Sequence, residues 1–272
     1  MKLAQVQQDQ SVGTPGAIHR SRALSWAGFY GLILAAWASI FVMTPAATES
    51  EFVTLYGQDF WNSLCRAAAD AEPLALMGMW MLMSIAMMAP TLVPTLKVYD
   101  DLGYCDAADT RGFLGLVSGY LGIWFTFSVA AAAAQMALAK YDLLAPDGSS
   151  RSVWLTVILL GLAGLYQFSA LKEACLTRCR QPLAFFLEHW RPGTRAAFSM
   201  GARLGANCLG CCWALMALGF IGGTMNLVWM GAATAFMILE KLPDIGRHLS
   251  LPLGGGLLMA AGAAFAHALG LV

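Results

Sequence analysis

The stretch that decides the fold is Met77-Gly-Met-Trp-Met-Leu-Met-Ser-Ile-Ala-Met-Met-Ala-Pro90, which carries no charged residue. It lies within an apolar segment at 73–93, and a membrane-spanning helix needs about 20 such residues. Working outward, further apolar segments occur at 24–43, 113–138, 153–171, 196–220, 226–239 and 251–271. The sequence therefore predicts an all-α integral membrane protein, a bundle of about seven transmembrane helices.

The composition excludes a soluble globular domain. Hydrophobic residues make up 58% of the 272 residues and charged residues 12%, whereas soluble domains have about 45–50% and about 25%. The formal net charge is zero, so no nucleic-acid partner is indicated and the lipid bilayer is the expected environment. The seven cysteines are an odd number, which does not indicate a disulfide framework.

The distribution of basic residues predicts an orientation. If the N-terminus is cytoplasmic, 13 Lys and Arg residues fall on the inner side and 3 on the outer side, as the positive-inside rule requires. We expect a flexible N-terminal tail at 1–22 and a polytopic membrane domain at 23–272, with its motifs at 73–243. The first outer loop contains a stretch, 52–69, that could form a short helix on the membrane surface.

The segment at 73–93 is rich in methionine, with six of the chain's 15. At about 100° per residue these form two stripes on a helix. The first stripe is Met79, Met83 and Met87, and the second stripe is Met77, Met81 and Met88. Thioethers are soft ligands suited to Cu(I), and methionine is also a flexible packing residue. Pro90 and Pro94 are expected to break or kink this helix and to free backbone carbonyls.

The segment at 196–220 contains the triplet Cys208-Leu-Gly-Cys211-Cys212. Cys208 and Cys212 share one helix face and Cys211 lies about 60° from Cys208, so the three sulfurs can converge. Thiolates select Cu(I), zinc or an iron–sulfur cluster. The alternative is packing, because small residues recur here and allow a second membrane helix to approach closely. Both interpretations hold if that second helix brings methionine sulfurs to the triplet.

Two more cysteines, Cys175 and Cys179, are spaced i, i+4 near the inner end of the fourth segment. They are candidate ligands at the inner mouth, or simply interfacial cysteines in a basic loop. If the second, fourth and fifth segments touch, sulfurs would follow one another at graded depths from this pair through Met87 and Met88 to the triplet. Asn226 is expected to cap the sixth helix. Glu240 and Lys241 are interpreted as interfacial charges, and Cys65 and Cys105 receive no role.

Several of these motifs together resemble a bacterial family of predicted metal-binding integral membrane proteins. The resemblance is carried by Ser84-Ile-Ala-Met-Met-Ala-Pro-Thr-Leu-Val-Pro94, Leu171-Lys-Glu-Ala-Cys-Leu-Thr-Arg-Cys-Arg-Gln-Pro182, Cys208-Leu-Gly-Cys-Cys-Trp213, Met225-Asn-Leu-Val-Trp-Met230 and Glu240-Lys241. Some members are linked to copper supply for a polyphenol oxidase. The resemblance implies a multi-pass protein of the bacterial inner membrane, and it extends over about 73–243.

The function predicted from these observations is copper handling without catalysis. The protein would bind a soft metal, Cu(I) or alternatively zinc, and move or present it to a copper enzyme or receive it from a soluble copper carrier. One alternative is a metal-free membrane assembly subunit, with the small-residue stripe as a docking face. The other is a membrane thiol oxidoreductase using Cys208–Cys212, a class that usually needs cysteines near a water interface.

Overall fold

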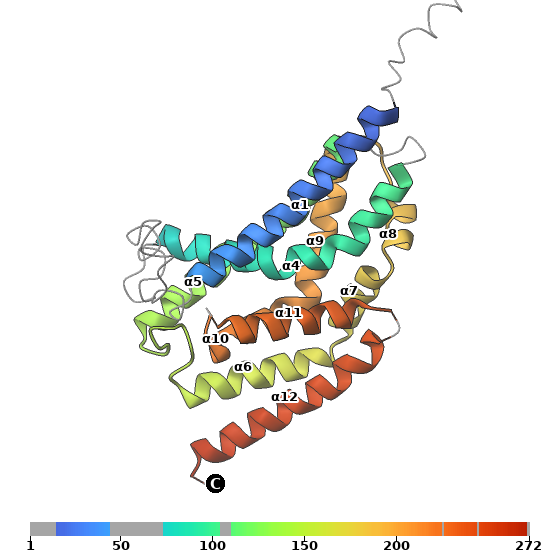
Figure 1. The fold of residues 1–272 in the computed structure, drawn as a ribbon. Coiled ribbons are helices and arrows are strands. Elements are labelled where there is room, and N and C mark those ends of the chain that lie inside the picture. The colour runs from blue at the N-terminus through green and yellow to red at the C-terminus, as the bar shows by residue number, and fades with distance from the viewer. Residues whose placement is uncertain (1–14, 44–72, 104–109, 225, 244, 271–272) are drawn as a thin grey trace, which may run out of the picture.

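The described part of the chain is mostly helical, and its connection at 141–152 is built from turns. The computed structural model describes residues 15–43, 73–103, 110–224, 226–243 and 245–270. Its helices are α1 Pro15–Met43, α4 Pro73–Gly103, α5 Thr110–Lys140, α6 Val153–Gln167, α7 Ala170–Arg180, α8 Pro182–His189, α9 Thr194–Ala217, α10 Gly219–Gly222, α11 Leu227–Lys241 and α12 Gly246–Ala268. The predicted all-α class is confirmed (Figure 1).

Five helical segments among the described residues are long and apolar enough to cross a membrane: Ser21–Met43, Pro73–Leu102, Thr110–Lys140, Thr194–Gly222 and His248–Ala268. The pair α6 and α7 would make a sixth. Helix α11 has 15 residues, fewer than the ~20 that a span needs, so the count of seven and the orientation stay predictions. Residues 15–22 of the expected tail are helical. The stretch 52–69, Cys65 and Cys105 lie outside the described residues.

The fourth predicted segment, 153–171, is not one straight helix. Helix α6 ends at Gln167, and α7 starts at Ala170 at an angle of 62° to it. The break coincides with Ser169, whose hydroxyl accepts a hydrogen bond from the Lys172 backbone nitrogen at 3.1 Å. A serine in this N-cap position starts a new helix because it satisfies a backbone donor that would otherwise lack a partner.

Helix α4 continues through both prolines, so the predicted break does not occur. Pro90 has no N–H, and the carbonyl of Ala86 therefore loses its helical partner. The Trp37 indole of α1 donates to that carbonyl at 2.9 Å. Helix α4 changes direction along its length (Figure 1), and the freed carbonyl is satisfied by a neighbouring helix.

Helices α5 and α9 are in very close contact, with glycines on both sides. A Cβ atom at Gly119 would lie 2.1 Å from the carbonyl oxygen of Phe198, and one at Gly201 would lie 2.0 Å from that of Leu116. Small residues allow this approach. The predicted small-residue stripe is thus in use, but the helix that closes on it is α5 and not the methionine-rich α4.

Helix α11 brings two charged residues to the interior. Its start is capped as predicted, since the Asn226 side chain accepts from the Val228 and Trp229 backbone nitrogens, both at 3.1 Å. Its last two residues are Glu240 and Lys241, and α4, α7, α9 and α12 pack around the helix. The end of α11 therefore lies where the cysteine-bearing helices meet.

Candidate metal centre

The three cysteines of α9 form a buried cluster of free thiols. The sulfurs of Cys208, Cys211 and Cys212 all lie within 4.8 Å of one another. The Cys211 and Cys212 sulfurs are 3.2 Å apart and those of Cys208 and Cys212 are 4.0 Å apart. Each residue is 2% exposed. The convergence expected from the helical spacing is present, because i, i+3 and i, i+4 side chains share one face.

Three other helices place polar side chains around Cys208. The hydroxyl of Tyr120, from α5, lies 2.9 Å from the Cys208 sulfur, and the Lys241 amine, from α11, lies 3.0 Å from it. Lys241 also donates to the Thr91 hydroxyl of α4 at 2.7 Å. An ammonium group has donors only, so the sulfur accepts this hydrogen bond. A negative charge on Cys208 would therefore have a compensating positive charge in direct contact.

Lys241, Tyr120 and Thr91 were missed in the sequence. The sequence favours an interfacial position for Lys241, although a lysine at the end of an apolar helix can also face the interior of the helical bundle. Tyr120 follows Gly119, one of the glycines at which α5 touches α9. A tyrosine beside such a close contact was the available signal for a side chain reaching the cysteine helix.

The helix that carries the second cysteine pair packs against the helix that carries the triplet. A Cβ atom at Gly210 would lie 2.6 Å from the Cys175 sulfur, so this thiol packs directly on α9. The Cys179 thiol lies close enough to Cys211 to interact with it electrostatically. Both α7 cysteines are partly exposed. The buried triplet of α9 thus has two more accessible cysteines of α7 as neighbours.

Most of the methionine side chains of α4 are buried in the interior of the helical bundle. The first stripe, Met79, Met83 and Met87, is buried, with 3–5% exposure. Of the second stripe, Met88 is fully buried whereas Met77 and Met81 are partly buried.

Helix α4 packs mainly on α5 and α1. Its Thr91 hydroxyl lies 3.9 Å from the Cys208 sulfur, and its Met88 carbonyl accepts from Tyr120 at 3.1 Å and from Thr91 at 2.8 Å. Of the three segments assumed to touch, the second therefore reaches the fifth through Thr91, and the second half of the fourth, α7, packs on α9.

A buried charged network holds α7 and α11 together. The Lys172 amine donates to a Glu240 carboxylate oxygen at 2.6 Å, and both side chains are 2% exposed. Gln167 accepts from the same amine, and Ser250 donates to the same carboxylate oxygen at 2.6 Å. Arg180 donates to the Glu240 carbonyl at 3.0 Å. Buried charges persist when they are paired in this way, and this pair fixes the helix that carries Cys175 and Cys179.

Fold and site define a class: a helical protein with several membrane-length apolar helices and a buried thiol cluster, a donor set suited to a soft metal ion. Over residues 77–264 the chain matches the family described as PpoB2, copper chaperone. The chain therefore belongs to this family, and the resemblance found in the sequence is confirmed. The match includes Cys175, Cys179, the triplet of α9 and Lys241. It also extends over most of α12, which lies beyond the motifs seen in the sequence.

The family description names a chaperone and no catalytic activity. Neither a curated protein nor a solved structure matches the chain.

Proposed function

We propose that the protein binds Cu(I) at Cys208, Cys211 and Cys212 and delivers it, in a bacterial inner membrane, to a copper-requiring enzyme. The observation that carries this proposal is the set of three buried free thiols within 4.8 Å of one another. Soft thiolate ligands favour Cu(I). Zinc is the competing metal, since a structural zinc site takes four ligands and Cys179 could supply the fourth beside Cys211.

The surroundings of Cys208 support a charged, metal-bearing site. Cu(I) held by two or three thiolates leaves a net negative charge, which is costly in an apolar interior unless it is paired. Lys241 supplies the opposite charge at 3.0 Å from the Cys208 sulfur, and the Tyr120 hydroxyl lies 2.9 Å from the same sulfur. Such outer partners orient metal ligands and tune their affinity.

The accessible side of the cluster supports transfer as well as binding. Cys175 and Cys179 are partly exposed, Cys175 packs against Gly210 of α9, and Cys179 interacts electrostatically with Cys211. Copper could therefore pass between thiols by ligand exchange. The first methionine stripe and Met88 stay proposed ligands on the α4 side, through which the ion would continue toward the copper enzyme.

The two alternatives gain less support. A metal-free assembly subunit would need the small-residue stripe of α9 as a docking face, but Gly201 is already packed against α5 of the same chain. A thiol oxidoreductase needs cysteines that meet a partner, and Cys208, Cys211 and Cys212 are 2% exposed.

The test is a titration of purified, reduced protein with Cu(I) in the presence of a chromophoric Cu(I) chelator. We expect tight binding that excess Zn(II) does not displace. Cys208→Ser and Cys212→Ser should each weaken it by more than the about 10–100-fold typical of losing an outer-sphere partner. Cys65→Ser is the matched control and should bind as the unmodified protein does. Unchanged affinity in the two triplet variants, or displacement by zinc, would contradict the proposal.

A further inference from the structure

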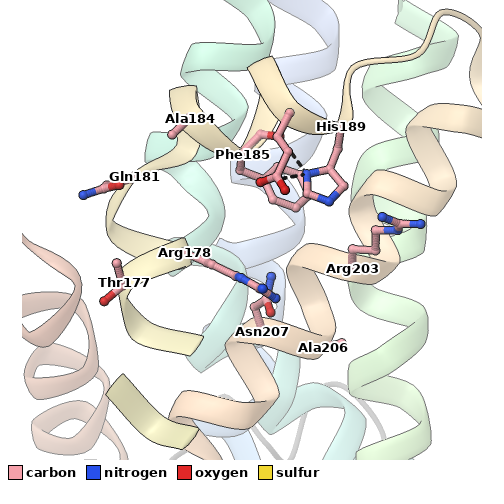
Figure 2. Close-up of a pocket in the computed structure, with 10 residues that line it drawn as sticks. Thr177, Arg178, Gln181, Ala184, Phe185, His189, Arg203, Ala206 and Asn207 are labelled. Carbon is pink, nitrogen blue, oxygen red and sulfur yellow. Dashed lines mark hydrogen bonds and ion pairs between the residues drawn. The ribbon is translucent and has the colours of Figure 1, made fainter. Parts of the chain in front are cut away.

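Two adjoining cavities open around α8, at the end of the bundle where α9 begins. The first lies between α7, α8 and α9 and has a volume of about 400 Å³. In it, Arg178 extends from α7 toward Asn207 on α9 (Figure 2). The second has a volume of about 460 Å³ and shares Glu188, His189 and Arg203 with the first. We call the two cavities together the arginine pocket, because four arginines line them: Arg178, Arg191, Arg195 and Arg203.

The arginine pocket has an excess of positive charge. Among the residues that the structure describes, no carboxylate forms an ion pair with any of its four arginines. The acidic residue of the lining is Glu188, which lies 3.7 Å from the His189 ring nitrogen (Figure 2). A guanidinium group presents a planar fork of donors that fits a phosphate group. The pocket therefore favours an anionic, phosphate-like ligand.

The position of the pocket along α9 is that of lipid headgroups. The membrane-length segment that contains α9 is Thr194–Gly222, and about 20 helical residues cross the hydrocarbon core. Counted back from the end of this segment, about 20 residues reach Arg203, and Arg195 lies about two turns further out. The Tyr99 ring, 5.5 Å from the Trp190 ring, adds aromatic residues at the same end, and such residues are enriched at membrane interfaces. Arg203 therefore lies at the edge of the hydrocarbon core, at the level of lipid phosphates.

Exposed apolar side chains accompany the arginines. Helix α8 lines both cavities, and its Leu183 and Leu187, one turn apart, are exposed, whereas its Phe185 and Phe186 are buried. Phe198, which belongs to the same part of α9 as Arg195 and Arg203, is also exposed. Large apolar side chains are unfavourable in water and favourable against acyl chains. The ligand that matches this surface therefore has both a phosphate and an apolar part.

We propose that the arginine pocket binds the headgroup phosphate of an anionic phospholipid, whose acyl chains lie against the exposed leucines of α8. This inference goes beyond the proposed copper function and does not depend on it. Both cavity volumes are in the range of small-molecule sites, roughly 300–1,000 Å³. This end of the bundle is the one predicted to face the cytoplasm, the side on which basic pockets between membrane helices bind anionic headgroups. A phosphate held by Arg178 and Arg203 would join α7 to α9.

The experiment measures lipid binding to the purified full chain in a neutral detergent by native mass spectrometry. Anionic phosphatidylglycerol is titrated and compared with zwitterionic phosphatidylcholine. We expect saturable binding of phosphatidylglycerol, and binding of phosphatidylcholine that is weaker by about fivefold or more, the effect of one charge near a membrane surface. Arg178→Gln combined with Arg203→Gln should weaken binding of phosphatidylglycerol by about 30-fold, about fivefold for each arginine.

Lys97→Gln combined with Arg111→Gln is the matched control, because it removes the same charge near the same end of the bundle. Lys97 of α4 and Arg111 of α5 are exposed, and neither is among the described residues that line the arginine pocket. This control should bind phosphatidylglycerol as the unmodified protein does. An equal loss in both double variants would show attraction by net charge alone and overturn the inference, as would unchanged binding in the pocket variant.

Two further arms separate a lipid site from misfolding and from a site for free phosphate. The unfolding temperature without lipid should be the same in the pocket variant and the unmodified protein, and phosphatidylglycerol should raise it only in the unmodified protein. Inorganic phosphate in large excess should leave binding of phosphatidylglycerol unchanged, because it has no acyl chains to cover the leucines. Displacement of the lipid by inorganic phosphate, or equal binding of phosphatidylcholine, would overturn the inference.

Discussion

Replacing Gly201 by alanine tests whether the close contact of α5 with α9 builds the copper site. The added Cβ would lie 2.0 Å from the Leu116 carbonyl oxygen, and ordinary contact begins at 3.4 Å, so the atoms must separate by about 1.4 Å. The Leu116 oxygen belongs to the backbone and cannot rotate away as a side-chain atom could. Overpacking costs up to about 3 kcal/mol, and alanine regains about 1 kcal/mol of helix propensity. We expect a net loss of about 2 kcal/mol.

The same separation acts on the metal centre. A shift of this size breaks the 2.9 Å contact between the Tyr120 hydroxyl and the Cys208 sulfur. Loss of such an outer partner typically lowers metal affinity about 10–100-fold. Stability is measured by reversible unfolding in mixed micelles, and copper affinity by titration against a Cu(I) chelator.

Gly122→Ala, in α5, is the matched control because nothing lies within 4 Å of its Cβ position. It should raise stability by up to about 1 kcal/mol and leave copper affinity unchanged. If Gly201→Ala unfolds and binds copper as the unmodified protein does, the α5–α9 contact does not position Tyr120, and the account of the site is wrong.

Two further predictions concern residues outside the triplet. Lys241→Gln keeps a donor but removes the charge beside Cys208, so Cu(I) affinity should fall about 10–100-fold, while Lys140→Gln at the end of α5 should have no effect in the same titration. Leucine in place of all three methionines of the first stripe should cost under about 1.5 kcal/mol per site and abolish activity of a copper enzyme in cells. The same change at Met77 and Met81, the two members of the second stripe that are not proposed ligands, should have little effect, and equal activities at matched membrane abundance would show that these methionines only pack.

Local patterns in the sequence predicted what depends on local spacing. The apolar segments gave the helical class, the i, i+3 and i, i+4 positions of Cys208, Cys211 and Cys212 gave converging sulfurs, and Asn226 gave the cap of α11. These features depend on helix geometry within one element, so one sequence contains enough information to derive them.

Features that depend on which helices are neighbours were not predictable. The small-residue stripe of α9 indicated close packing but not that α5, with Tyr120, would be the partner. The sequence favours an interfacial position for Lys241, and only the tertiary fold shows that the end of α11 points at Cys208. That α7 packs along α9, with Cys175 against Gly210, depends on the bend after α6 and was not predictable for the same reason.

The Lys172–Glu240 pair constrains how the protein is made. Its partners are 68 residues apart in sequence, so Lys172 leaves the ribosome long before Glu240 is synthesised. An unpaired lysine costs up to about 2.5–3.5 kcal/mol on insertion scales, the value for the centre of a membrane helix. Helix α7 therefore has to wait at a hydrated or protein-lined site until α11 arrives. The same helix, α11, carries Lys241, so the positive charge beside Cys208 reaches the cysteine triplet only late in biogenesis.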